Sequence, residues 1–353
     1  MNEAPKKWIR QEIESLDPET DYVRIWRLSS SYGLNEFMSG LSYVTTFQNF
    51  VVTDWGSEAI WRDDGGKVLK RPFGRVEQTE GANFIWWFYG PHDERTKKSV
   101  DAINRLHAYW AKKLPGRFSY NDDYVYVAAY TATSMHRFRL ALGLPGFLEK
   151  EKFAAHKFWG EMTKLFVAEN NTPLHGYPDD FDGLLAFCER YEHEPRPRVE
   201  RVNLIVSAFH EQFVFRFFPK ELHWLGHQLL RALSLPTTLE TAQIDPPLPA
   251  AKQLLPKLLG FILSYQEEFA DDPQSSYLES LEQLSPEQKV ERRAEMVELD
   301  KAFGPYFKQI VHDDAKFSGC PFHEALKAST PATGTTSAGA VTEMERTSVP
   351  HAH

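Results

Sequence analysis

The sequence NDDYVYVAAYTATSMHRFRLAL, residues 121–142, decides the fold class of this chain. It opens on polar and acidic residues and is closed by GLPG at residues 143–146, which is typical of a helix with a sharp C-terminal stop. His136 follows Ala129 and Ala132 by seven and four residues, so one helix face combines a histidine with small side chains. We therefore predict a helix over 121–142 with room beside His136 for a flat cofactor.

Further helical patterns flank this segment on both sides. We predict helices over 93–112, 149–169, 181–192, 202–218, 220–233, 249–269 and from Ser285 onward. Residues 32–61 mix small and aromatic side chains as buried helices do. Residues 71–91 are punctuated by glycine and proline and are predicted to be a loop. The sequence contains no set of segments with the period-two alternation of strands. The sequence therefore predicts an all-α protein with a single large helical domain.

The two ends of the chain differ in composition from its middle. Residues 1–20 form a polar lead-in with one amphipathic stretch, and residues 329–353 are of low complexity and predicted to be disordered. The predicted helical domain therefore spans residues 21–328.

Composition narrows the classes of partner and site. The 353 residues carry a net charge of −9, which disfavours binding to nucleic acid through the overall field. We find neither a run long and apolar enough for a transmembrane helix nor a secretory signal at the start, so we expect a cytoplasmic protein. With 13 histidines and only 2 cysteines, Cys188 and Cys320, any bound metal must be held mainly by histidine and carboxylate.

Three histidines lie on or beside the apolar faces of predicted helices. His107 and His136 are on consecutive helices and could face a shared cavity, and His156 has the same character. A histidine in such a position is more often a hydrogen-bonded core residue than a ligand. His223 and His227 have the i, i+4 spacing of a metal chelate, although an amphipathic surface helix is the more frequent reason for that pattern.

Several short motifs, taken in order, resemble one known family. They are found at Ile103–His107, Phe118–Asp122, Leu140–Phe147, Phe158–Met162 and Leu222–Thr237, and together they cover about residues 30 to 270. In this order they resemble the MpaB-type oxygenase family, which includes latex-clearing protein. The resemblance implies an all-α protein with a globin-like core that holds haem b through a histidine. It also implies dioxygen as co-substrate and oxidative cleavage of a carbon–carbon double bond in an isoprenoid.

The resemblance also implies which residues form the site, when the positions of the family's motifs are matched to this sequence. His136 is the expected iron ligand, with His107 as the alternative. Arg105 and His107 are the expected catalytic residues on the distal side, where Arg105 replaces a lysine of the family. Tyr130 and Ala132 complete the expected haem contacts.

Three functions remain open at this point. The first is a haem-dependent oxygenase acting on a hydrophobic small molecule, with Trp86, Trp87, Phe88 and Trp110 as the apolar wall of its pocket. The second is a non-catalytic helical carrier that binds haem or lipid. The third is a helical interaction protein without a metal, in which the histidines belong to the core. The sequence does not predict the oligomeric state.

Overall fold

Helix α8 (Asn121–Ala141) confirms the helix predicted over residues 121–142. Asp122 and Asp123 occupy its first turn, where carboxylates interact favourably with the positive end of the helix dipole. The chain leaves the helix at Gly143, whose φ of +77° is one that glycine adopts without strain. This arrangement is seen in a computed structural model that describes residues 6–62 and 64–313.

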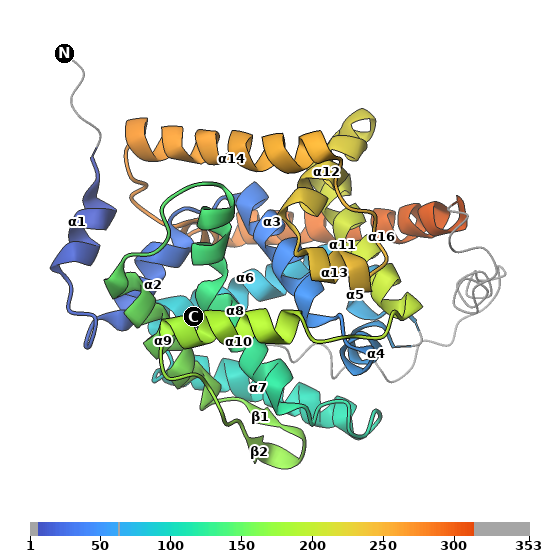
Figure 1. Cartoon of the computed structure of the whole chain (residues 1–353), viewed down its shortest axis with the longest axis horizontal. Helices are drawn as coiled ribbons and strands as arrows, with labels where there is room; N and C mark the ends of the chain where they lie inside the picture. The colour runs from blue at the N-terminus through green and yellow to red at the C-terminus, as the bar shows by residue number, and fades with distance from the viewer. Residues whose placement is uncertain (1–5, 63, 314–353) are drawn as a thin grey trace.

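The predicted all-α fold is confirmed, since 73% of the described residues are helical and the helices pack as one domain (Figure 1). The described residues form the helices α1 (Trp8–Ser15), α2 (Tyr22–Ser31), α3 (Glu36–Phe47), α4 (Asp54–Trp61), α5 (Gly66–Lys70), α6 (Pro72–Tyr89), α7 (Glu94–Ala111), α8, α9 (Glu149–Thr163), α10 (Phe181–Glu192), α11 (Glu200–Phe217), α12 (His223–Leu233), α13 (Pro236–Thr241), α14 (Pro249–Phe269), α15 (Tyr277–Glu282) and α16 (Pro286–Asp313). Short 3-10 helices lie at η1 (Gln48–Phe50), η2 (Glu169–Asn171) and η3 (Lys220–Leu222).

Two segments differ from the sequence-based expectation. Residues 72–89 form helix α6, so the predicted loop was wrong. Pro72 is tolerated because it occupies the first turn of the helix, where its missing N–H would have no helical partner. The helix ends only at Gly90. Helix α9 stops at Thr163, and part of the predicted helix beyond it forms a small antiparallel hairpin of β1 (Val167–Ala168) and β2 (Thr172–Pro173).

The ends of the domain are defined by α1 and α16. Helix α1 is the amphipathic stretch predicted in the lead-in, and its Ile13 is buried against the rest of the protein. The tail predicted over 329–353 and Cys320 lie outside the described residues. None of the described helices has the length and apolar composition that a membrane span requires.

Two hydrophobic clusters form the interior. The first core is built from α2, α8, α9 and α10 around Trp26 and Phe158, and the second is built from α3, α5, α11 and α16 around Phe209 and Phe303. Helix α6 contributes to both, because Phe73 near its start belongs to the second core and Trp87 near its end to the first. Helix α6 therefore ties the two cores into one domain.

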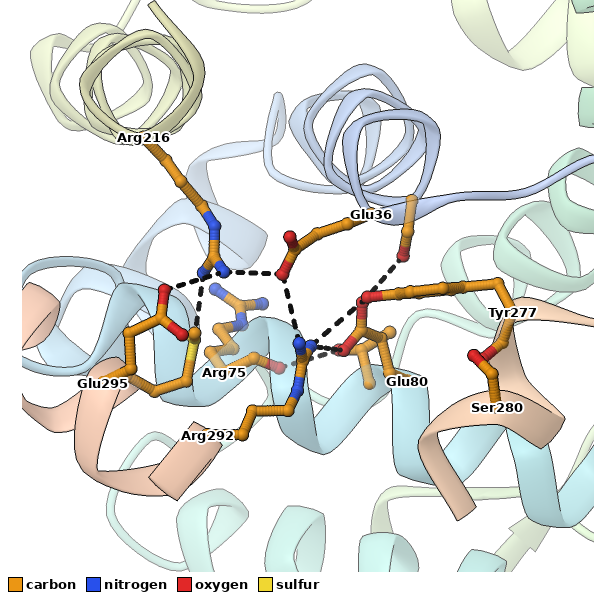
Figure 2. Close-up of polar contacts among 11 residues, drawn as sticks. Glu36, Arg75, Glu80, Arg216, Tyr277, Ser280, Arg292 and Glu295 are labelled. Atoms are coloured by element: carbon orange, nitrogen blue, oxygen red, sulfur yellow. Dashed lines mark hydrogen bonds and ion pairs between the residues drawn. The ribbon is translucent and has the colours of Figure 1, made fainter. Parts of the chain in front are cut away.

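A partly buried network of ion pairs joins α6 to three other helices (Figure 2). Arg292 of α16 donates to Glu80 of α6 at 2.9 Å and to Glu36 of α3 at 3.1 Å, and Arg216 of α11 donates to Glu36 at 2.6 Å. Tyr277 of α15 also donates to Glu80. Glu80 is only 5% exposed, and burial raises the pKa of its carboxyl while Arg292 offsets part of that shift. The network stabilises the packing of α16 on the rest of the domain only while each buried charge keeps its partner.

We predict that Arg292→Met lowers the free energy of unfolding by about 3 kcal/mol, because it leaves the Glu80 carboxylate buried without its cation. The double variant Glu80→Gln/Arg292→Met should regain at least half of this loss, because the buried charge is then gone as well. Urea denaturation measures both. Arg10→Met, which breaks the exposed pair with Glu14, is the control and should change stability by less than about 0.5 kcal/mol. A double variant no more stable than Arg292→Met would contradict this account.

Candidate functional site

His136 lies near the C-terminal end of α8 and is enclosed by the turn that follows the helix. Its Nδ1 accepts a hydrogen bond from the backbone N–H of Phe147 at 2.9 Å, and its ring packs on Phe147 and Phe181. Gly146 passes so close that a Cβ at this position would lie 2.5 Å from the imidazole. Burial lowers the pKa of His136, so its ring is held neutral. The histidine therefore fastens the 143–147 turn to the helix.

This hydrogen bond decides whether His136 suits an iron. A neutral imidazole carries one proton, and a ring whose Nδ1 accepts from an N–H carries that proton on Nε2. An iron ligand needs a bare nitrogen, with the other nitrogen donating to a second group. His136 has the reverse arrangement, because its Nδ1 is already used as an acceptor. The geometry of His136 does not fit the ligand role that the resemblance implies.

His107 and Arg105 lie on α7 in different surroundings. The half-buried His107 ring packs against Phe118 and Tyr124 at 5.3 and 5.9 Å between centroids. Its buried Nδ1 has no hydrogen-bond partner among the described residues, and burial lowers the pKa of the ring to about 4. Arg105 is exposed and pairs with Asp101 on its own helix. Arg105 thus faces solvent and does not share a pocket with His107.

The structure does not bring the predicted site residues together. His107 contacts Tyr124, which precedes His136 by twelve residues in α8, and this separation is about 18 Å along a helix. Tyr130 is buried with its hydroxyl near the carbonyl of Thr45, and Ala132 is fully buried in the first core. Tyr130 and Ala132 are therefore packed against other parts of the protein itself.

The aromatic wall predicted for a substrate pocket is packed in the same way. Trp87 belongs to the first core, and the indole N–H of Trp86 donates to Ser99 at 3.0 Å. Arg27 covers the ring of Phe88, and Arg62 covers that of Trp110. These rings stabilise the packing of neighbouring helices.

A hollow of substrate size in the described part has a mixed lining. It has a volume of about 550 Å³ and lies between the start of α8, the segment before α10 and α10 itself. It is lined by Asn121, Asp122, His175, Gly176, Pro178, Gly183, Ala186, Phe187 and Arg190. None of the five predicted site residues lines it. Its polar and charged groups suit a greasy substrate poorly.

Two further histidines of the described part are held by side-chain hydrogen bonds within the protein. His156 bonds to the carbonyl of Pro178, and buried His210 bonds to Gln48. Within residues 6–62 and 64–313, no group of three or more histidine, cysteine, aspartate or glutamate side chains could hold a metal ion.

His223 and His227 join a polar cluster that the sequence did not predict. His227 Nε2 lies 3.1 Å from Glu211, which also accepts from Tyr306 at 2.8 Å, and Tyr306 lies 3.1 Å from His223 Nδ1. Glu211 and Tyr306 are 95 residues apart, so no local motif could have signalled the cluster. It links α11, α12 and α16 through hydrogen bonds.

The most unusual surface in the described part is the outer face of α14. We use this name for the exposed apolar side chains on the side of α14 that points away from the domain: Leu254, Leu258, Phe261, Ile262, Tyr265 and Phe269. Their exposed fractions range from 43% for Ile262 to 69% for Phe261. The helix runs along one edge of the molecule, at the top of Figure 1. A contiguous apolar surface of this kind marks a contact site for another molecule.

No family model matches this chain, and no curated protein matches it either.

We predict that His107→Phe does not destabilise the protein at pH 7.5, because phenylalanine fills the same apolar site without an unpaired nitrogen. The folded-state pKa of about 4 lies below the ordinary value, so the wild type loses stability as the pH falls from about 6.5 to 4. The variant should not show this loss, which amounts to at most about 3 kcal/mol of the free energy of unfolding. Urea denaturation at several pH values measures it.

His136→Phe serves as the comparison and should cost about 1–3 kcal/mol at pH 7.5, because it leaves the Phe147 N–H unpaired. This cost should shrink in acid, because burial also lowers the pKa of His136 and the wild type loses stability there. If His107→Phe is as acid-sensitive as the wild type, the His107 ring is not shielded from water in the folded protein.

Proposed function

We propose that this chain is a non-catalytic helical interaction protein and that the outer face of α14 is its contact surface. The observation that carries the proposal is that α14 has apolar side chains on both faces. A helix that is apolar all round is normally covered all round. In this protein only one face of α14 is covered by the rest of the chain.

The covered inner face explains why α14 presents a fixed surface. Leu259 and Leu263 pack on the second core, and Gly260 lies so close to the carbonyl oxygen of Leu142 that a Cβ would be 2.3 Å from it. Arg139 at the end of α8 pairs with Glu267 of α14. These contacts set the rotation of α14 about its axis, and the outer stripe is thereby held in a single orientation.

Water is an unfavourable environment for that stripe. Covering apolar surface is favourable by roughly 25 cal/mol per Å². An interaction protein uses this energy when its partner binds. The proposal places the interaction in the cytoplasm, where free thiols such as the buried Cys188 persist in reduced form.

A haem-dependent oxygenase, the function that the resemblance implies, is the rival proposal. It needs an imidazole nitrogen free to bind iron beside a cavity for the macrocycle. The Nδ1 of His136 is engaged by Phe147, and His107 is packed between aromatic rings without Arg105 beside it. The observed contacts support the interaction protein over the oxygenase.

We predict that the full chain, expressed with an added haem precursor and purified, shows no Soret band in its oxidised or reduced absorption spectrum. The physical reason is that His136 is engaged by the Phe147 N–H and His107 is packed against aromatic rings. A haem protein expressed in parallel is the control for haem supply. A Soret band that persists through gel filtration, and that His136→Ala or His107→Ala abolishes, would restore the oxygenase proposal.

A further inference from the structure

The outer face of α14 has the spacing of a helix-pairing seam. Leu254, Leu258, Phe261 and Tyr265 follow one another at intervals of four, three and four residues. This alternation is the 3.5-residue repeat with which one helix packs its side chains between those of another. A narrow stripe of this kind matches a second helix better than a flat lipid surface.

Charged residues divide α14 into two unlike halves. The exposed Lys252 and Lys257 are in the N-terminal half, and Glu267 and Glu268 are in the C-terminal half. Two such helices in antiparallel orientation place the basic half of each opposite the acidic half of the other. A parallel orientation places lysine opposite lysine and is disfavoured by the repulsion.

The exposed apolar area of the outer face of α14 approaches the area that each partner buries in a stable protein–protein interface. A large aromatic side chain presents roughly 150–250 Å², and the six exposed side chains together present on the order of 600 Å². A stable interface buries about 800 Å² on each partner, so the stripe and the charged residues beside it approach the requirement. The net charge of −9 also disfavours an anionic membrane as the partner.

Resting on the proposed function, we infer that the partner of the outer face of α14 is a second copy of this chain. The two α14 helices pack antiparallel about a two-fold axis between Phe261 and Ile262. Leu254 of each copy then faces Phe269 of the other, and Leu258 faces Tyr265. The interface is self-complementary, as a two-fold axis demands.

Sedimentation equilibrium of the full chain tests this inference. We expect a dimer at micromolar concentration, and we expect Phe261→Asp to weaken dimerisation by about 100-fold or more, because it places a charge at the centre of the seam. Val290→Asp, on the exposed part of α16, is the matched control and should leave the dimer unchanged.

Charge reversal tests the antiparallel orientation in the same measurement. Lys257→Glu should weaken the dimer about 3- to 10-fold, and Lys257→Glu/Glu268→Lys should restore most of the loss. A double variant weaker than Lys257→Glu would overturn the antiparallel arrangement.

Co-sedimentation with vesicles of neutral phosphatidylcholine separates failure of the inference from failure of the proposed function. A wild-type monomer that binds these vesicles, and no longer does so as Phe261→Asp, overturns the second copy as partner but keeps α14 as the contact surface. A wild-type monomer that does not bind them overturns the second copy as partner and excludes a neutral lipid surface, so that the proposed function would require a different protein on α14.

Discussion

The close approach of Gly260 to the carbonyl oxygen of Leu142 fixes which face of α14 is buried and which is exposed. Any side chain at position 260 would overlap with that oxygen, so α14 can cross the end of α8 only with its glycine facing inward. Once the glycine is fixed, the helix period assigns every other residue of α14 to a face. Leu259 and Leu263 turn toward the second core, and Phe261 and Tyr265 turn toward water. The exposed stripe is thus a consequence of how α14 is seated.

The histidines show how one hydrogen bond distinguishes a structural role from a ligand role. His136 has the position that the resemblance assigns to an iron ligand, but the Phe147 N–H occupies the nitrogen that would have to donate to a second group. His107 has a free nitrogen, yet aromatic rings surround it and Arg105 points to solvent. In both cases the burial that lowers the pKa of the imidazole is supplied by the protein's own side chains.

Sequence patterns predicted the helices that have a clear start and stop, and they failed where a feature depends on distant residues. The bounds of α10 and α14 agree with the predicted ranges, because acidic or proline starts and polar ends mark them. Helix α6 was missed because its glycines and Pro72 are typical of a loop. The packing of Phe73 and Trp87 in the two cores, which stabilises the helix, cannot be seen in the local sequence. The Glu211 and Tyr306 cluster and the exposure of Phe261 depend on packing between segments far apart in the chain. No local pattern encodes such contacts.

Disulfide cross-linking tests most directly whether α14 pairs with α14 of a second copy in antiparallel orientation. Ile262 lies beside the inferred two-fold axis, whereas Leu254 would be about 22 Å from its counterpart, beyond the roughly 7 Å over which two cysteines can be bridged. In a chain that carries Cys320→Ser, we expect the variant Ile262→Cys to form a covalent dimer rapidly under mild oxidation. We expect the variant Leu254→Cys to form none. Equal cross-linking of both variants, or of neither, would contradict the antiparallel pairing.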